Sequence, residues 1–415
     1  MIAPGLVAPR PPPVEPASWS PRTAGPPAEA AALARVIAFY LPQFHPIPEN
    51  DEWWGPGFTE WTNVAKAKPL YRGHAQPFLP SELGFYDLRV PEVREQQAEL
   101  ARYGGVESFC YWHYWFGNGR RILERPFEEV LASGAPDFPF CLAWANQSWT
   151  GIWHGSPNKT LIEQLYPGRA DQEAHFRWAQ RAFEDPRYSK VDGKPIFVVF
   201  APHEMPSTEA FVDHWRELAH QAGYPGIYFV GVSDGYRSAQ DRYDLPWLKP
   251  FDAVTLLGPR DYLTATSMQP KSRLHALAGR VRRGDFGRFN RFRPASWARP
   301  RVFDFARVVE LALQDMPDGE RYLPSILSGW DNTPRSSARG VVYEGFTPDL
   351  FRASLKKAVD RVRHRPSASR IVFLKAWNEW AEGNVVEPSA VHGRALLDAI
   401  REVVRPSDAG EARAS

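Results

Sequence analysis

Short apolar runs recur along the chain, and a longer segment with helical periodicity follows most of them. Runs of four to six residues bounded by turn residues are typical of buried strands, and strands that alternate with helices indicate a parallel sheet with helical crossovers. We predict eight strands, at Val36–Tyr40, Val106–Tyr111, Phe140–Trp144, Ile196–Phe200, Ile227–Val230, Ala253–Leu257, Leu323–Leu327 and Ile371–Ala376. The helices are predicted at Pro91–Tyr103, Pro126–Ala132, Gln172–Phe183, Thr208–Ala222, Phe305–Gln314, Pro348–Arg363 and Arg394–Val404, with only a weak one after the fifth strand.

The number of strand and helix units decides between two parallel architectures. Eight units spread over about 370 residues favour a single (β/α)8 barrel, the TIM barrel of the α/β class, with long loops. The alternative is a doubly wound open sheet, which commonly carries a glycine-rich phosphate loop after its first strand. The first predicted strand leads instead toward Gln43, Phe44 and His45, so we predict the barrel.

Three segments lie outside this alternation. Residues 1–32 are rich in Pro and Ala and are expected to form a disordered leader, and residues 406–415 a disordered tail, with the barrel over residues 33–405. An insertion at about 259–301 is rich in Arg. We expect its Arg stems to pack on the barrel surface; the alternative is a patch that binds an anionic glycan, a lipid headgroup or nucleic acid.

Polar and aromatic side chains gather where five of the predicted strands end. Barrels of this kind place their chemistry at the carboxyl ends of the strands, and flat aromatic rings suit the C–H faces of sugars. The alternative for each aromatic or His side chain is a place in the hydrophobic core. The candidates for substrate binding are Gln43, His45, Trp61, Trp112, His113, Tyr114, Trp144, Asn146, Trp330, Asp331 and Asn378.

The stretch Ile371–Pro388 carries the strongest candidates for catalysis. It begins as the eighth strand and then places Glu379 and Glu382 three residues apart among Trp and Asn side chains. Ionised carboxylates are costly to desolvate unless they are paired or used, and two carboxylates that flank one bond are what acid/base chemistry on a sugar requires. The alternative is a surface pair near a helix N-terminus. Glu60 is a weaker candidate on a longer loop, and Glu387 is expected to be structural.

The charge balance and the missing motifs narrow the class of protein. Lys and Arg total 50 and Asp and Glu total 48, a net charge of +2, which argues against a dedicated nucleic-acid binder. No apolar stretch reaches 18 residues, so we expect no integral membrane segment. The start lacks the basic and apolar regions of a signal peptide, which favours a cytoplasmic location. Neither a metal-ligand spacing nor a nucleotide-binding motif is present, so we expect no metal and no other cofactor.

Five motifs together resemble one known group of proteins. They are Ala38-Phe39-Tyr40-Leu41-Pro42-Gln43-Phe44-His45, Gly57-Phe58-Thr59-Glu60-Trp61, Tyr111-Trp112-His113-Tyr114-Trp115-Phe116, Pro139-Phe140-Cys141-Leu142-Ala143-Trp144-Ala145-Asn146 and Trp377-Asn378-Glu379-Trp380-Ala381-Glu382-Gly383. With these motifs the chain is similar, over about residues 35–404, to the WbsX-like proteins, which are related to glycoside hydrolase family 99, the endo-α-mannosidase family.

The resemblance implies a role for each glutamate of the last motif. In family 99, the first glutamate deprotonates the sugar 2-hydroxyl, which attacks the anomeric carbon and forms a 1,2-anhydro sugar. The second protonates the leaving oxygen and then activates water. Carried over, Glu379 is the base and Glu382 the general acid/base. The chain departs from the common WbsX-like pattern at Gln147, where a glutamate is usual, and at His154, where an acidic residue is common.

Three functions follow as hypotheses. The first is a retaining glycoside hydrolase that cleaves α-mannoside-like linkages in an oligosaccharide or surface polysaccharide. The second is a glycosyltransferase in O-antigen, lipopolysaccharide or capsule biosynthesis, which would need groups that bind an activated donor. The third is an inactive carbohydrate-binding relative, which Gln147 and His154 motivate.

Overall fold

The structure is a computed structural model, and it describes residues 32–151, 156–233, 243–257, 300–314 and 316–405. Nearly all of the predicted leader and of the predicted Arg-rich insertion, the predicted tail and His154 lie outside the described residues.

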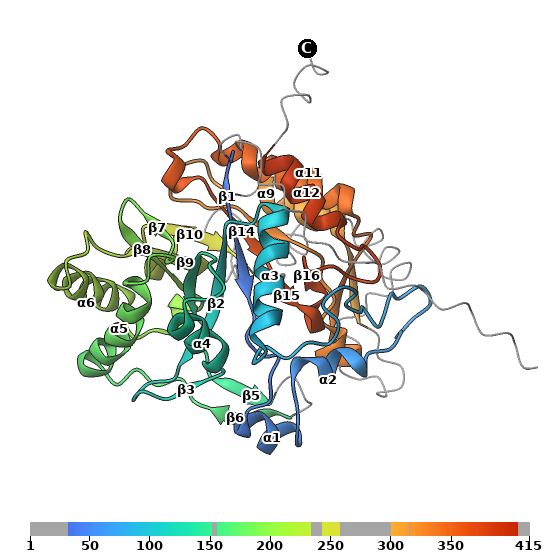
Figure 1. Cartoon of the computed structure of the whole chain (residues 1–415), viewed down its shortest axis with the longest axis horizontal. Coiled ribbons are helices and arrows are strands. Elements are labelled where there is room, and N and C mark those ends of the chain that lie inside the picture. The colour runs from blue at the N-terminus through green and yellow to red at the C-terminus, as the bar shows by residue number, and fades with distance from the viewer. Residues whose placement is uncertain (1–31, 152–155, 234–242, 258–299, 315, 406–415) are drawn as a thin grey trace, which may run out of the picture. The chain divides into compact units, whose positions relative to one another are not determined.

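Eight parallel strands form the barrel (Figure 1). Their order around the sheet is β10, β9, β8, β4, β2, β1, β14 and β12. A parallel bridge between Val254 and Tyr322 brings the two edges together, because the Val254 N–H donates to the Arg321 carbonyl at 2.8 Å and the Leu323 N–H donates to the Val254 carbonyl at 2.9 Å. The predicted barrel is confirmed. The strands are β1 (Arg35–Tyr40), β2 (Ser108–Trp115), β4 (Phe140–Trp144), β8 (Lys194–Val199), β9 (Tyr228–Ser233), β10 (Ala253–Leu256), β12 (Ser325–Leu327) and β14 (Ile371–Lys375).

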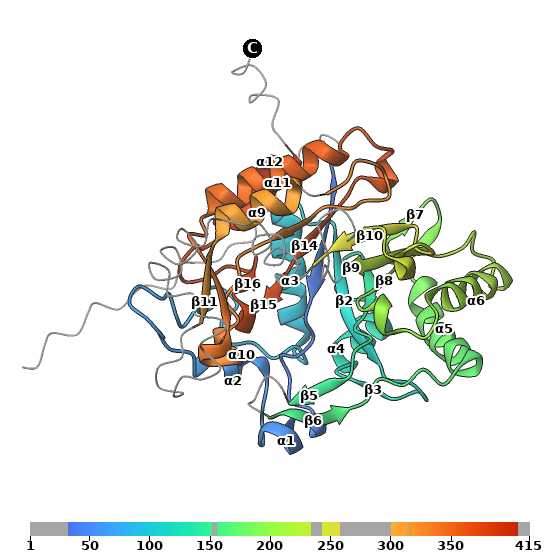
Figure 2. The same ribbon diagram turned by 180° about the vertical axis from the view of Figure 1, so that it is seen from behind.

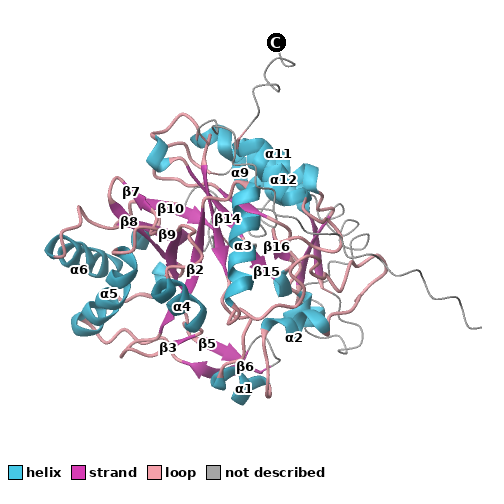
Figure 3. Ribbon diagram, in the orientation of Figure 1, coloured by secondary structure: helices cyan, strands magenta, loops and turns pink. Residues whose placement is uncertain are grey.

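Helices surround this sheet (Figure 3). Local signals fix their ends: the Ser207 hydroxyl accepts from the Ala210 N–H to cap one helix, and Gly105 ends another with a φ of 77°. All seven predicted helices are present, with ends shifted by at most three residues. They are α3 (Pro91–Gly104), α4 (Arg125–Ser133), α5 (Arg169–Phe183), α6 (Thr208–Gln221), α9 (Phe305–Gln314), α11 (Pro348–Val362) and α12 (Ala395–Val404). None of these described helices combines the length and the apolar character needed to cross a bilayer.

The second strand is longer than predicted. Tyr114 and Trp115 pair with Ile122 and Arg121 of the short strand β3 (Arg121–Ile122), so the aromatic residues expected after the strand lie within it. Since successive side chains of a strand point to opposite faces, neighbours in this motif have different surroundings.

Short elements lie in the loops around the sheet, and several gather at the carboxyl ends of the barrel strands. Figure 2 shows α2 and α10 near β15, which follows β14. A contact between the rings of Trp53 and Trp149 joins α1 to β5. The elements are α1 (Pro48–Trp54), α2 (Glu60–Ala65), β5 (Trp149–Gly151), β6 (Ser156–Ile162), β7 (Lys190–Val191), η2 (Pro202–Glu204), η3 (Pro246–Leu248), β11 (Arg301–Asp304), α10 (Thr333–Ser336), η6 (Ser337–Arg339), β13 (Val341–Glu344), η7 (Ser367–Ser369), β15 (Asn378–Glu379), η8 (Trp380–Glu382) and β16 (Asn384–Val385).

Candidate active site

The turn that follows β14 is tied to the end of β1. The Asn378 side chain accepts a hydrogen bond from the Leu41 N–H at 2.7 Å and donates one to the Leu41 carbonyl at 3.0 Å. Both are buried, so the amide takes the place of a strand partner for Leu41. Glu379 follows directly and pairs with Asn384 in the β15–β16 hairpin. The position of the two candidate glutamates is therefore set by the barrel itself.

Two glycines let the loop after β12 touch this turn. A Cβ atom added to Gly329 would lie 2.6 Å from the Gly383 carbonyl oxygen, and one added to Gly383 would lie 3.0 Å from the Asp331 nitrogen. The Asp331 N–H donates to the Glu382 carbonyl. Because both glycines also have positive φ angles of 114° and 59°, neither position tolerates a side chain without strain.

Three glutamates converge on the guanidinium group of Arg335, which α10 supplies. Its Nε donates to Glu60 at 2.8 Å, its Nη1 to Glu382 at 2.7 Å and its Nη2 to Glu379 at 3.1 Å. Glu60, Glu379 and Glu382 are only 2%, 5% and 7% exposed, so these ion pairs are shielded from water. Glu60 belongs to this cluster together with the two candidates from the strand-eight turn.

A second cation, Lys375, lies at the end of β14. Its Nζ donates to Glu382 at 3.3 Å and lies 4.0 Å from Glu379. It also lies 5.6 Å from the ring centre of Trp330, a cation–π distance. Tyr114 is buried beside the cluster, and burial followed by the charge of Glu379 raises the pKa of its hydroxyl. Three carboxylates and two cations thus share one buried site.

The pKa values of the two glutamates are shifted in opposite directions. Burial and then the neighbouring Glu382 carboxylate raise the pKa of Glu379. Burial also acts to raise the pKa of Glu382, but its ion pairs with Lys375 and Arg335 outweigh that effect, and its pKa lies below the usual value. When one proton is shared by the pair, this arrangement favours a protonated Glu379 and an ionised Glu382.

Glu387 forms a separate network behind the same turn. It is buried and accepts hydrogen bonds from the Tyr86 hydroxyl at 2.9 Å, the Trp380 Nε1 at 2.7 Å and the Gln97 Nε2 at 2.6 Å. The Asn378 amide donates to the same Tyr86 hydroxyl at 3.3 Å. Burial raises the pKa of Glu387 to about 7 despite these donors. Glu387 therefore supports the turn through partners other than those of Glu379 and Glu382.

Replacing Glu387 with Gln is expected to flatten the pH dependence of stability. A pKa raised from 4.5 to about 7 means that the folded state holds a proton that the unfolded state releases. The free energy of unfolding of the wild type should therefore fall by about 3 kcal/mol as the pH rises through that window. Urea unfolding at about pH 5 and about pH 7 measures this slope. The exposed Glu82→Gln variant is the control and should keep the wild-type slope; an unchanged slope in Glu387→Gln would contradict the assignment.

Several predicted substrate-binding residues lie away from the glutamates. His113 packs on Trp178 and His175 of α5, and burial lowers its pKa to about 3. Trp144 donates to the Trp115 carbonyl at 3.0 Å. The Asn146 amide is bonded to both the carbonyl and the N–H of Ala201, so it joins the loops after β4 and β8.

The remaining candidates near β1 and β2 are also buried. His45 bonds the Pro42 carbonyl through Nδ1 at 2.9 Å, and burial lowers its pKa. Gln43 is buried, and its carbonyl accepts from the N–H of Glu60. Trp112 stacks on Phe39 at 4.8 Å. Trp61 packs on Trp380, with ring centres 5.7 Å apart, and donates to the Tyr86 carbonyl.

Asp331 lies at the edge of the cluster and holds two loops together. It accepts from His74 at 2.7 Å and Gln76 at 2.6 Å, and from the Thr333 hydroxyl at 2.6 Å and N–H at 3.0 Å. Burial alone would raise its pKa, but these hydrogen bonds outweigh burial and lower it. Gln147, the departure from the family pattern, donates to Glu204 at 2.7 Å.

Sequence reasoning missed both cations of the site. Lys375 was detectable, since it is the one charged residue in an otherwise apolar predicted strand. Arg335 had no such signal, because its environment depends on the packing of α10 against residues more than 40 positions away. Among the described residues, no group of three or more His, Cys, Asp or Glu side chains is arranged to hold a metal ion.

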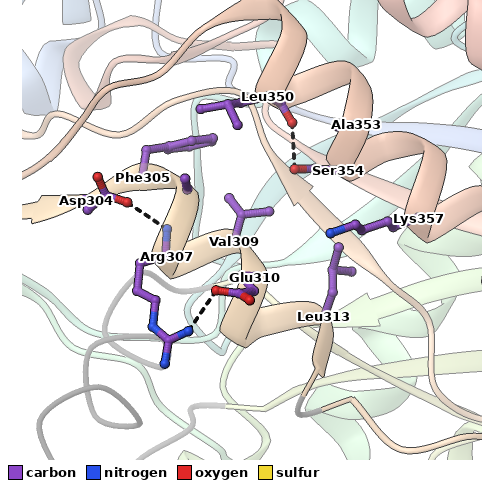
Figure 4. Close-up of a pocket in the computed structure, with 11 residues that line it drawn as sticks. Asp304, Phe305, Arg307, Val309, Glu310, Leu313, Leu350, Ala353, Ser354 and Lys357 are labelled. Atoms are coloured by element: carbon purple, nitrogen blue, oxygen red, sulfur yellow. Dashed lines mark hydrogen bonds and ion pairs between the residues drawn. The ribbon is translucent and has the colours of Figure 1, made fainter.

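A cavity of about 390 Å³ lies elsewhere, between α9 and α11 (Figure 4). Phe305, Val309 and Leu350 line it together with Arg307 and Lys357. None of the site residues described above contributes to it, so it is separate from the glutamate cluster.

Two solved structures are similar to this chain, and the first of them shares its fold. A glycoside hydrolase-like protein is 16% identical to this chain, covers 92% of it and 98% of its own length, and has a TM-score of 0.56. The GH99 endo-α-mannosidase from Bacteroides thetaiotaomicron is 14% identical, covers 92% of this chain and 99% of its own length, and has a TM-score of 0.48.

Sequence relatives give the family. The uncharacterized protein WxcX from Xanthomonas campestris pv. campestris (strain B100) is 38% identical over 373 residues, which make up 89% of this chain and 50% of that protein. WxcX from a second strain matches equally well, so the chain spans about half the length of these curated relatives. The model of the family described as "Glycosyltransferase WbsX" matches residues 36–400. The chain belongs to the WbsX family.

Proposed function

We propose that the protein is a carbohydrate-active enzyme that hydrolyses α-mannoside-like linkages of an oligo- or polysaccharide with retention of configuration. The observation that carries the proposal is the pair Glu379 and Glu382, buried at the carboxyl end of β14 and held by one guanidinium group. Buried carboxylates with divergent pKa values are the groups that acid/base catalysis on a glycosidic bond uses.

In the first step, the Glu379 carboxylate removes the proton of the sugar 2-hydroxyl. That oxygen attacks the anomeric carbon while the bond to the leaving oxygen breaks, and Glu382 gives its proton to the leaving oxygen. In the second step, Glu382 takes a proton from water, which attacks the anomeric carbon and opens the 1,2-anhydro ring. The 2-oxygen recovers its proton from Glu379, so both glutamates return to their first states.

This reaction requires a protonated Glu382 at the moment of bond cleavage, whereas its ion pairs with Lys375 and Arg335 favour the carboxylate form. Binding of a sugar must therefore weaken those ion pairs, or the two glutamates exchange roles. The leaving-group dependence of the Glu382→Gln and Glu379→Gln variants separates these two possibilities.

An activity screen tests the proposed function. The wild type and Glu382→Gln would be incubated with α-manno-configured aryl glycosides and oligosaccharides, with β-manno and α-gluco substrates as controls. We expect hydrolysis of α-mannosides by the wild type and, with the oligosaccharides, a loss well above about 100-fold in the variant. Hydrolysis that survives Glu382→Gln undiminished would remove Glu382 from the mechanism.

The family description favours a second candidate, transfer of a sugar from an activated donor. Incubation with sugar nucleotides and an oligosaccharide acceptor distinguishes the two. Turnover of a sugar nucleotide, with no hydrolysis of any glycoside, would replace the hydrolase proposal by the transferase. Binding of oligosaccharides without either reaction would indicate an inactive carbohydrate-binding relative.

A further inference from the structure

We propose that Arg335 is a positioning residue for the reaction, a single guanidinium group that fixes both candidate catalytic carboxylates and Glu60 relative to one another. The inference rests on the proposed function and extends it to a residue outside the motif that carries the glutamates. It follows from the geometry of three hydrogen bonds and from the elements that supply them.

Each nitrogen of Arg335 serves a different carboxylate, and each carboxylate comes from a different element. Nε bonds Glu60 of α2, Nη2 bonds Glu379 of β15 and Nη1 bonds Glu382 of η8. A guanidinium group is planar and rigid, so its nitrogens impose fixed directions on all three partners. Arg335 therefore determines how far apart the two candidate catalytic oxygens lie.

No other described cation repeats this pattern. The Lys375 Nζ lies 3.3 Å from Glu382 and 4.0 Å from Glu379. Its ammonium group is a point charge, so it does not fix the directions of its partners as a guanidinium group does. The Glu60 carboxylate also accepts a hydrogen bond from the Asn63 amide at 3.1 Å. Without Arg335, the site would hold three buried carboxylates, and only the ammonium group of Lys375 would offset their charge.

Backbone contacts keep Arg335 in place. α10 begins two residues after Asp331, and the Asp331 side chain accepts from the N–H and the hydroxyl of Thr333, the first residue of α10. The Asp331 N–H is bonded to the carbonyl of Glu382 itself. The segment that carries Arg335 and the turn that carries the glutamates are thus one hydrogen-bonded unit, and Arg335 closes it at the side chains.

The test compares Arg335→Ala and Arg335→Lys with Arg187→Ala. Arg187 is the matched control, because its side chain is 8% exposed against 12% for Arg335 and it forms an ion pair with Asp185 at 2.7 Å, but it lies next to the start of β4. With nitrophenyl α-mannosides, Arg335→Ala should lose about 100-fold in kcat with KM changed less than about threefold. Arg335→Lys should also be slow, and added methylguanidinium should restore part of the Arg335→Ala activity.

A purely structural role predicts a different result. It would make Arg335→Ala resemble Arg187→Ala, with lower stability but kcat within about threefold of the wild type, and either that outcome or a fully active Arg335→Lys would overturn the proposal. If Arg335→Ala does not fold, Arg335→Lys decides, since it keeps a positive charge in the cluster.

A measurement without turnover separates this inference from the proposed function. The buried carboxylates of Arg335→Ala would have pKa values above those in the unfolded chain, so the stability of the variant should be highest at low pH and fall as the pH rises from about 5 to about 8, relative to the wild type. If the wild type hydrolyses no glycoside but this pH effect is present, the proposed hydrolase function is refuted and the proposed role of Arg335 is not. Equal pH profiles for Arg335→Ala and wild type would refute the proposed role of Arg335.

Discussion

Glu382→Gln is expected to slow hydrolysis of α-mannosides by a factor that depends on the leaving group. If Glu382 protonates the departing oxygen, its loss matters most for alkoxide or sugar leaving groups and least for a dinitrophenolate, which needs no proton. We expect a loss of about 10⁴-fold with an oligosaccharide and about 100-fold or less with dinitrophenyl α-mannoside. Steady-state rates for a series of aryl mannosides of graded leaving-group pKa measure the dependence.

The same series tests the reversed roles, which the pKa directions of the two glutamates make a specific alternative. The ion pairs with Lys375 and Arg335 stabilise the charged form of Glu382. A steep leaving-group dependence in Glu379→Gln, with a flat one in Glu382→Gln, would assign proton donation to Glu379. Glu204→Gln is a control, because Glu204 accepts its hydrogen bond from Gln147. This variant should keep the leaving-group dependence of the wild type.

Glu379→Gln is expected to abolish turnover for good and poor leaving groups alike. Its proposed task is to remove the proton of the 2-hydroxyl, and no leaving group makes that unnecessary. The expected loss is at least about 10³-fold with both dinitrophenyl mannoside and an oligosaccharide. Substrates with the 2-hydroxyl replaced by hydrogen should be inert to the wild type as well, which checks the step from the side of the sugar. If the wild type hydrolysed a 2-deoxy substrate as fast as the substrate with its 2-hydroxyl, the result would contradict the 1,2-anhydro route.

The fold could be predicted because each strand and helix carries its own local signal. The eight apolar runs and their helices are each decided by side chains within the element, and glycines such as Gly105 mark the ends. The predicted end of the second strand was wrong. Tyr114 and Trp115 extend β2 by pairing with β3, a strand of only two residues that has no recognisable sequence pattern.

The site could be predicted only where its residues are neighbours in sequence. Glu379 and Glu382 share one turn, and their carboxylates stand out in an aromatic stretch. Glu60 and Arg335 join them from 275 positions apart. Glu60 stands in a motif but was only a weaker candidate, and nothing local marks Arg335. His113 shows the converse, since it stands in a conspicuous aromatic motif and yet faces α5 rather than the glutamates.

The pairing of β1 with β14 has a consequence for biosynthesis. Arg35 lies opposite Ile371 in the barrel, and Leu41 is bonded to Asn378, so β1 leaves the ribosome long before its partner β14 has been synthesised. Until then its open edge is available to other chains, and contacts so distant in sequence form slowly. Nascent chains that stop short of residue 371 would expose that edge permanently. Premature termination is therefore expected to yield aggregation rather than a partly active fragment.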